Sequence, residues 1–273
     1  MQNFICKTCG VQYAETENPP EKCIICEDER QYVGHDGQQW TTLSELNKTH
    51  KNIVRDVEPG LHGIGTEPRF AIGQRALLIQ SDAGNILWDC ITNIDVETIA
   101  EVKKRGGISA IAISHPHYYS SMIEWSRAFD NAPIYIHSDD KQWITRPDPA
   151  IKFWDGETLQ LQDGITLINN RGHFDGSTSL HWQSGADGKG ALLTGDTLYV
   201  TSDRRYVSFM YSFPNYVPLP VSDVKHIIKT LQPFDYDRIY SAWFDTVIPE
   251  DGKAAVNRSA ERYIAVLEER WKR

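Results

Sequence analysis

The chain has 273 residues, of which 40% are hydrophobic and 24% are charged. These values are typical of a soluble globular protein with one large domain and a small attached module, or with two ordinary domains. The formal net charge of −9 argues against a protein that follows nucleic-acid phosphates or binds anionic membrane surfaces.

The N-terminal segment does not resemble a targeting signal. Its sequence, MQNFICKTCG, lacks a charged region followed by an apolar one, which a secretory signal peptide would have. No window of the chain approaches the roughly 18 apolar residues of a membrane span. We therefore expect a cytoplasmic protein.

Residues 1–40 are predicted to form a small separate module around two CxxC pairs. Cys6 and Cys9 are separated from Cys23 and Cys26 by 13 residues that include a Pro-Pro pair. Thiolates from two tight turns match the tetrahedral preference of zinc, and metal binding would supply the folding energy that so short a segment lacks. In a reducing compartment the pattern favours a metal site over disulfides. The alternative is a set of unrelated surface cysteines.

The stretch CKTCGVQY resembles a rubredoxin or zinc-ribbon knuckle, with Gly10 and Tyr13 where rubredoxins carry similar residues. Rubredoxins hold redox iron, but their two knuckles lie farther apart and the second usually has the sequence CPxCG. Here the second knuckle is CIICE. The comparison favours structural zinc at the four cysteines over redox iron.

Residues 41–273 are predicted to form one larger domain of strands and helices. A capping-box signature begins at Thr42, helical spacing follows at 94–105, 120–129, 222–232 and from about residue 253, and a polar-aromatic loop is expected up to about residue 220. In the last helix the apolar face would hold Val256, Ala260, Ile264, Leu267 and Trp271. The order of strand-rich and mixed segments predicts a layered α/β sandwich. Predicted strands lie at 53–57, 69–73, 74–81, 84–90, 108–114, 133–138, 158–168, 178–183, 190–194 and 237–243.

Four stretches that follow apolar runs are candidates for a site at a sheet edge. His115 and His117 would project to the same side of an extended segment, and imidazole suits zinc or iron. Taken singly, His173 is also explained as a turn residue, and Asp196 and Asp89 as capping residues; the set as a whole favours a site. The stretches are ILWDC (86–90), SHPHYYSS (114–121), NRGHFDGS (170–177) and LLTGDTL (192–198).

In this order the stretches resemble the metallo-β-lactamase superfamily, over about residues 55–250. Members have a strand that ends near an Asp, then HxHxDH, a GHTPGS-like turn, a GD after an apolar strand and a terminal strand that ends in histidine. The resemblance implies an αββα sandwich with metal at the edge between the two sheets. It also implies that His115, His117 and His173 hold one metal ion and that Asp196 matches the bridging aspartate.

The sequence departs from the family pattern at the ligands of a second metal. The DH positions of HxHxDH are Tyr119 and Ser120, and the terminal strand has Trp243 or a neighbour in place of histidine. Trp and neutral Ser are not plausible zinc ligands, and Tyr is a poor one. Because all three losses fall on the same metal, we predict one ion, zinc or iron, in an otherwise degenerate binuclear centre.

The roles predicted for single residues follow from that interpretation. Asp196 is expected as a fourth ligand or as the acceptor of a proton from metal-bound water. Hydroxyls of Tyr118, Tyr119 or Ser120 are candidates to stabilise an oxyanion. Asp89 is expected to orient a ligand histidine by a hydrogen bond.

Substrate contacts are predicted at Tyr118 and Trp243. The aromatic segment 199–220 is interpreted as a substrate wall or as a loop that covers the core. His137 and His181 are expected as packed or surface residues, and Cys90 as an inert buried thiol.

Three classes of function remain open. The first is a mononuclear zinc hydrolase of an ester, thioester, lactone or amide, which we favour. The second is an iron oxygenase that resembles persulfide dioxygenases, with His115, His173 and Asp196 as a facial triad. The third is a non-catalytic binding protein. We expect a small-molecule substrate and neither nucleic-acid nor membrane partners; the oligomeric state is left open.

Overall fold

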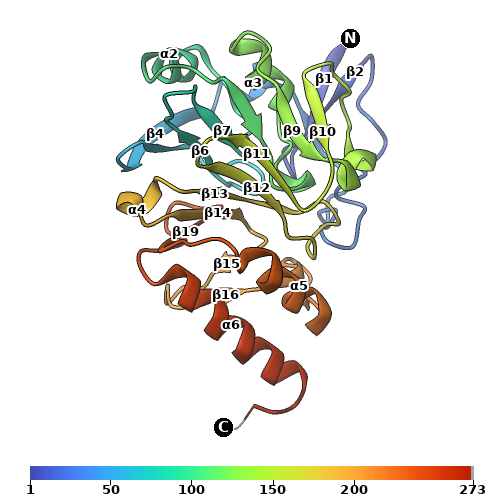
Figure 1. Ribbon diagram of the computed structural model, residues 1–273. Helices are drawn as coiled ribbons and strands as arrows, with labels where there is room; N and C mark the ends of the chain where they lie inside the picture. Colours follow the sequence, from blue (N-terminus) through green and yellow to red (C-terminus); the bar gives the residue numbers. More distant parts are fainter. Residues whose placement is uncertain (272–273) are drawn as a thin grey trace. The chain divides into compact units, whose positions relative to one another are not determined.

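The computed structural model describes residues 1–271 (Figure 1). By its internal contacts the chain forms two compact units, Met1–Trp154 and Asp155–Arg273. The four-cysteine segment belongs to the first unit. From the sequence we predicted a knuckle at residues 1–40 and a larger domain at residues 41–273, and this division stays a prediction.

The first unit begins with a small antiparallel sheet. Its strands are β1 (Gln2–Cys6), β2 (Gln12–Thr16) and β3 (Trp40–Thr41), in the order β2-β1-β3. Ile5 in the central strand is fully buried and lies opposite Gln12 on one side and Thr41 on the other. Because β3 comes after the whole cysteine segment, its pairing with β1 closes the knuckle.

Two helices of this unit begin at N-caps. Helix α1 (Leu43–Leu46) starts at Thr42, whose hydroxyl accepts the N–H of the third helix residue at 3.3 Å, as the capping-box signature predicts. Helix α2 (Val96–Lys104) starts after Asp95, whose carboxylate accepts the N–H of Thr98 at 2.7 Å.

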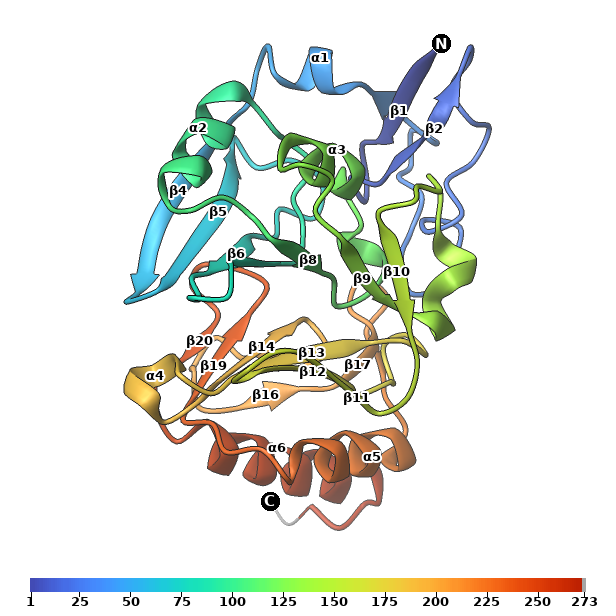
Figure 2. The same ribbon diagram turned by 45° about the horizontal axis from the view of Figure 1, so that its top comes forward.

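The main sheet of the first unit has seven strands. They are β4 (Lys51–Glu58), β5 (Leu61–Glu67), β6 (Ala76–Ile79), β7 (Ile86–Trp88), β8 (Ala110–Ala112), β9 (Ile134–His137) and β10 (Ile151–Trp154). Their order is β10-β9-β8-β7-β6-β5-β4, antiparallel from β4 to β7 and parallel from β7 to β10. Helices α2 and α3 (Met122–Ala128) cover one face (Figure 2). Because β7 and β8 run parallel, the residues after them meet at one edge of the sheet.

The predicted strand at 69–73 is wrong. This segment is irregular, and Ala71 and Gly73 have positive φ angles of 49° and 73°. A left-handed backbone does not continue a strand ladder. Strand β5 was missed instead, because Gly63 and Gly65 are poor strand formers that weaken the alternation of its sequence.

The second unit holds a six-stranded sheet. Its strands are β11 (Thr158–Gln162), β12 (Ile165–Asn169), β13 (Thr178–Trp182), β14 (Ala191–Gly195), β19 (Arg238–Ser241) and β20 (Val247–Ile248). They follow the order β11-β12-β13-β14-β19-β20, and the β14–β19 pair is parallel. Asp196 and Trp243, which follow these two strands, therefore leave the sheet at the same edge.

The predicted loop up to residue 220 contains two short antiparallel ribbons. One pairs β15 (Tyr199–Val200) with β16 (Val207–Ser208), and the other pairs β17 (Met210–Ser212) with β18 (Val217–Pro218). The segment is therefore an ordered part of the second unit.

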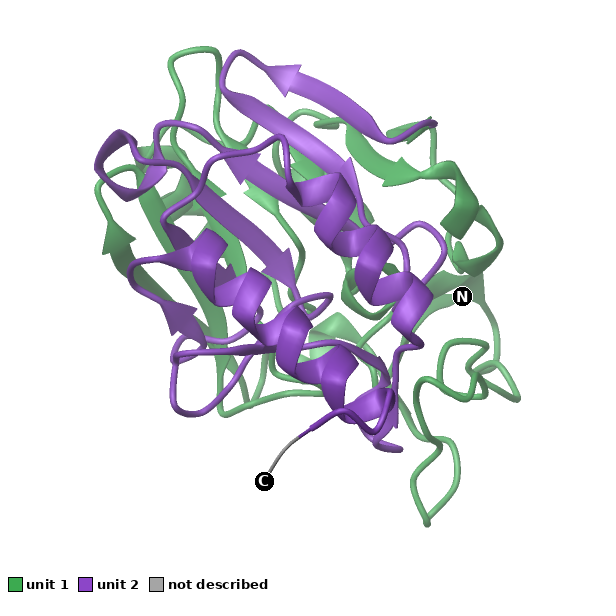
Figure 3. Ribbon diagram, turned by 60° about the horizontal axis from the view of Figure 1, so that its bottom comes forward, with its two compact units in different colours: residues 1–154 green, residues 155–273 purple. Residues whose placement is uncertain are grey.

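Helices α5 (Val221–Leu231) and α6 (Gly252–Leu267) lie side by side against the six-stranded sheet (Figure 3). Val256 and Ala260 of α6 are buried, as predicted. Leu267 is exposed and Trp271 lies beyond the helix end, so the predicted apolar face is wrong for these two. The core of this unit joins both helices to the sheet and the ribbons, through residues that include Ile168, Leu192, Phe209, Ile227, Leu231, Ile239, Val256 and Ala260.

Three short helical segments complete the chain. They are the 3-10 helices η1 (Pro116–Tyr118) and η2 (Ser138–Trp143) and the turn α4 (Gly185–Gly188).

Within residues 1–271, none of the helices combines the length and the apolar character that a bilayer crossing needs. The cytoplasmic location stays a prediction.

Candidate metal centres

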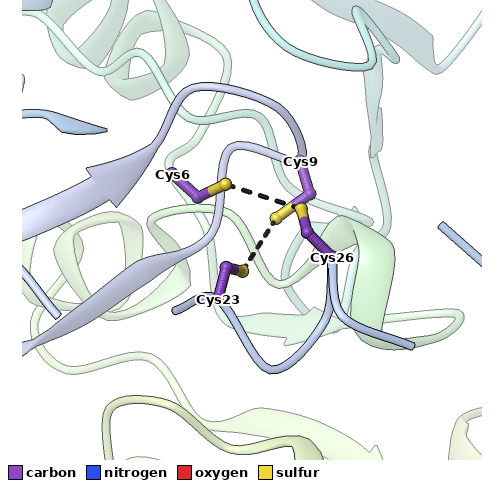
Figure 4. Close-up of side chains that lie close together, drawn as sticks. All are labelled: Cys6, Cys9, Cys23 and Cys26. Carbon is purple, nitrogen blue, oxygen red and sulfur yellow. Dashed lines mark hydrogen bonds between the residues drawn. The ribbon is translucent and has the colours of Figure 1, made fainter. Parts of the chain in front are cut away.

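The four cysteine sulfurs of the knuckle converge on one point (Figure 4). The Sγ atoms of Cys6 and Cys26 are 3.6 Å apart, and those of Cys9 and Cys23 are 3.7 Å apart. A tetrahedral ion with metal–sulfur bonds of about 2.3 Å would place its ligand sulfurs about 3.8 Å apart. All four cysteines are buried and none forms a disulfide. The donor set therefore fits a tetrahedral thiolate-bound metal ion.

Hydrogen bonds within the knuckle hold these sulfurs in place. The N–H of Gly10 donates to the carbonyl of Cys6 at 2.9 Å, and the Nε2 group of Gln38 donates to the Cys6 sulfur at 3.2 Å. Contacts with Cys23 first, and with Cys26 and Cys9, hold the pKa of the Cys6 thiol well below its ordinary value. Burial raises the pKa of the Cys9 thiol, so the fit to a metal ion rests on the spacing of the four sulfurs.

The first unit presents His115 and His117 directly after β8. Both imidazoles are buried, their candidate ligand nitrogens lie within 4.8 Å of one another, and their ring centroids are 5.1 Å apart. Nδ1 of His115 is 2.9 Å from the hydroxyl of Ser114, a group that can donate or accept. The extended segment predicted here is wrong in part: His115 has extended backbone, but His117 lies inside η1, which starts at Pro116.

Asp89 fixes the residue that precedes His115. Its carboxylate accepts the N–H of Ser114 at 2.8 Å, and its own N–H donates to Ala112 at 2.8 Å. Its action on a ligand histidine stays a prediction. Cys90 beside it is fully buried, and burial and the charge of Asp89 raise the pKa of its thiol, as an inert thiol requires.

The tyrosines and the serine after His117 are packed into the first unit. The ring of Tyr118 lies 4.4 Å from the ring of His115. The hydroxyl of Tyr119 donates to the carbonyl of Asp140 at 3.3 Å, and burial raises the pKa of this phenol. Ser120 donates its hydroxyl to the carbonyl of Cys90 at 3.2 Å. Their roles toward an oxyanion or substrate stay predictions.

The second unit brings His173 and Asp196 together. Nδ1 of His173 lies 2.9 Å from the carbonyl oxygen of Tyr211 and 3.2 Å from that of Met210. Carbonyls only accept, so Nδ1 carries the proton and the lone pair is on Nε2. That Nε2 is 3.9 Å from the carboxylate of Asp196, and both side chains are buried.

The backbone around this pair is set by local turns. Gly172, just before His173, has a φ of +89°, and a Cβ there would lie 2.9 Å from a methyl of Leu219, so the turn favours glycine. The hydroxyl of Ser241 donates to the carbonyl of Gly195 at 2.7 Å and so fixes the turn that carries Asp196.

A partly exposed aromatic cluster lies beside His173 in the second unit. The rings of Tyr199 and Phe213 are 5.1 Å apart, and those of Tyr199 and Trp243 are 5.3 Å apart. Phe213 is also 5.8 Å from the imidazole of His173. We call Tyr199, Phe213 and Trp243 the aromatic trio.

Some residues that orient the histidines were missed from the sequence. The carbonyls of Met210 and Tyr211 are backbone groups, so no side-chain pattern marks them. Ser114 lay inside the predicted stretch 114–121 but was given no role there. Ser241, which fixes the turn of Asp196, was visible only as a polar residue at a strand end, which is a weak signal.

The family of this chain follows from its similarity to a family model and to a known relative. The model of the metallo-beta-lactamase superfamily matches residues 71–243. The chain belongs to the metallo-β-lactamase superfamily. The uncharacterized protein YmaE of Bacillus subtilis (strain 168) is 52% identical over 269 residues, which are 98% of this chain and 97% of that protein.

Solved metallo-β-lactamases show the superfamily fold at low sequence identity. VMB-1 has a TM-score of 0.61 at 11% identity and covers 80% of this chain and 98% of its own. FIM-1 from Pseudomonas aeruginosa, in its mono-zinc form, has a TM-score of 0.57 at 12% identity and covers 79% of this chain and 96% of its own. The predicted α/β metallo-β-lactamase fold with a small N-terminal knuckle is thereby confirmed, and the cysteine and His/Asp side chains described above can bind metal ions.

Proposed function

We propose that the protein is a mononuclear zinc hydrolase of an ester, thioester, lactone or amide, and that His115, His117, His173 and Asp196 together hold its single catalytic ion. The main support for the proposal is the orientation of the His173 imidazole. Two carbonyls fix the proton on Nδ1 and leave Nε2 toward Asp196. A buried imidazole held in this way is the usual arrangement of a metal ligand.

The donor set supports zinc. His115 is likewise held at Nδ1, in its case by the Ser114 hydroxyl at 2.9 Å, a group that can donate or accept. Three imidazoles, one carboxylate and an open position suit a catalytic zinc. FIM-1, a fold neighbour, has a mono-zinc form, which supports a single ion in this fold.

The chemistry is divided between the ion and the chain. A bound zinc would lower the pKa of a water to about 7 and polarise a carbonyl. Asp196 would hold the proton of that water on its carboxylate. The aromatic trio would bind the apolar part of a small-molecule substrate and exclude water from it.

For the knuckle we propose structural zinc at Cys6, Cys9, Cys23 and Cys26. The sulfur spacing supports any tetrahedral thiolate site. Zinc is favoured over redox iron because the second knuckle is CIICE and not CPxCG.

Metal analysis of wild type and of His173→Ala tests the proposal. We expect two zinc ions per wild-type chain and one in the variant, with loss of esterase, thioesterase, lactonase or amidase activity in a substrate panel. His35→Ala, at an exposed position, is the matched control and should keep both ions and the activity.

Other outcomes select other functions. One zinc and one iron per wild-type chain would replace the hydrolase by the facial-triad oxygenase of His115, His173 and Asp196. One zinc that persists in every histidine variant would indicate a binding protein. A His173→Ala variant that kept both its ions and its activity would overturn the proposed centre.

A further inference from the structure

The turn that carries Cys6 and Cys9 is bonded to the segment after β7. The carbonyl of Gly10 in this turn accepts the hydroxyl of Thr92 at 2.9 Å. The approach is close: Gly10 has a φ of +83°, and a Cβ there would lie 2.4 Å from the Thr92 oxygen. Only glycine allows the knuckle to approach Thr92 so closely.

The strand that leaves this turn is bonded to the residues that follow His117. The N–H of Gln12 in β2 donates to the carbonyl of Ser120 at 3.0 Å. The carbonyl of Gln12 accepts the hydroxyl of Thr145 at 2.9 Å, and its side chain contacts the guanidinium of Arg146. Gln12 is only 4% exposed, so these bonds are shielded from water and strengthened accordingly.

Ser120 is held from several directions in a strained conformation. Its φ is +46°, in the left-handed region. Its hydroxyl donates to the carbonyl of Cys90 and accepts Nε2–H of Gln74 at 3.0 Å. A non-glycine residue persists in this region when the surrounding contacts over-determine it, and the bond from Gln12 is one of those contacts.

We propose that the metal-loaded cysteine knuckle positions the histidine loop, which we define as residues 114–121. Gln12, Thr92 and Ser120 are the positioning residues, and they transmit the order of the four-cysteine site to His115 and His117. Loss of the cysteine-bound ion frees the Gly10–Gln12 segment, and the histidine loop then opens more often. The consequence for metal affinity rests on the proposed function; the effect on loop order does not.

Hydrogen exchange of the histidine loop tests this inference in the full chain. In Cys23→Ser, which removes one ligand of the knuckle metal, we expect the loop amides to exchange at least about tenfold faster than in wild type. Thr92→Val keeps all cysteines and removes one buried hydrogen bond, for which about fivefold faster exchange is expected. Thr92→Ser restores the hydroxyl and should restore the wild-type rate.

Thr16→Val is the matched control, because the Thr16 hydroxyl bonds Asn18 on the exposed side of the knuckle. It should leave the loop unchanged. Cobalt titration of the histidine centre is the second readout: Thr92→Val should weaken Co²⁺ binding there about fivefold, and Thr92→Ser should restore it.

The inference is overturned if the loop amides keep their wild-type rates in both Cys23→Ser and Thr92→Val while amides 6–12 exchange freely in the former. The knuckle would then have no influence on the order of the histidine loop. The proposed hydrolase is judged separately by His173→Ala, so the failure of one proposal is distinguishable from the failure of the other.

Discussion

At the scale of single residues, backbone carbonyls and a hydroxyl orient the histidines of the proposed centre. His173 is held by the carbonyls of Met210 and Tyr211, and His115 faces the hydroxyl of Ser114. The orientation of His173 therefore depends on the backbone of β17 and not on the side chains of that strand. Substitutions at Met210 or Tyr211 that keep the ribbon intact leave this contact in place.

Trp243→Ala tests the aromatic trio. We expect KM for the best substrate of the panel to rise about tenfold with kcat within about twofold, because a lost aromatic contact weakens substrate binding without changing the reacting groups. The turn itself should survive, since its bonds with Thr246 involve only the backbone of Trp243. Steady-state kinetics measures both constants.

Trp271→Ala, at an exposed tryptophan beyond α6, controls for the loss of an indole and should change neither constant. A fall in kcat at unchanged KM in Trp243→Ala would mean that Trp243 acts at the reacting centre instead of in binding.

The ligand types of the candidate site could be predicted from the sequence, because spaced Cys, His and Asp residues after apolar runs are side-chain signals. The shape of the histidine pair could not. Pro116 starts a 3-10 turn directly after His115, so a turn and not an alternating strand brings the two rings to one side. The use of Ser120 to bond the knuckle was also not foreseeable, since the acceptor is its backbone carbonyl.

At the scale of elements, β13 carries the buried His181, and because of it we expect the second unit to lose stability in acid. Nε2 of His181 donates to the carbonyl of Asp235 at 2.7 Å. Burial is the main cause that lowers the pKa of His181 below its ordinary 6.5, and Lys253 adds to it, while the contacts with Asp235 oppose it. The folded state therefore prefers the neutral ring.

The sign of the pH dependence follows from this preference. The unfolded chain takes up the proton first as the pH falls below about 6.5, so the folded state loses stability between there and the lower folded pKa. His181→Gln keeps a donor but does not titrate, and its free energy of unfolding should fall less than that of wild type between about pH 7 and about pH 5.

Urea unfolding at several pH values measures the difference. His35→Gln, at an exposed position, should follow wild type over the whole range. Parallel pH profiles for wild type and His181→Gln would show that this histidine does not contribute.

The helices and strands that could be predicted were those whose apolar residues recur in a regular pattern. Continuous apolar runs such as β14 and the spaced apolar residues of α5 were found because burial on one or both faces leaves a periodic signal. The ribbons β15 to β18 were missed as strands because each has only two or three residues, too few for any period. Their aromatic residues marked the segment without showing its form.

At the scale of the whole molecule, thiol chemistry separates the two kinds of buried cysteine. Four buried cysteines share the knuckle site, and Cys90, which is also fully buried, is not part of that site. In the metal-loaded protein we expect no rapid reaction with a thiol reagent. After chelation the four knuckle thiols should react, because metal binding supplies the folding energy of so small a module, and Cys90 should react only on addition of denaturant.

Titration of reactive thiols against time measures these steps, and re-addition of zinc before the reagent should restore protection. If all five cysteines reacted together after chelation, the knuckle metal would stabilise the whole first unit. If none reacted, the knuckle would fold without its ion.

The central position of β1 limits how far this molecule can be divided into parts. Its partner β3 lies beyond the last cysteine, so removing residues 1–39 would leave Trp40 and Thr41 without the strand that they pair with. The same cut would strip the donor from the carbonyl of Ser120 and the acceptor from Thr92. Trimming the chain to residues 71–243, the segment that the family model matches, would therefore remove the bonding partners of Thr92 and Ser120 inside that same segment.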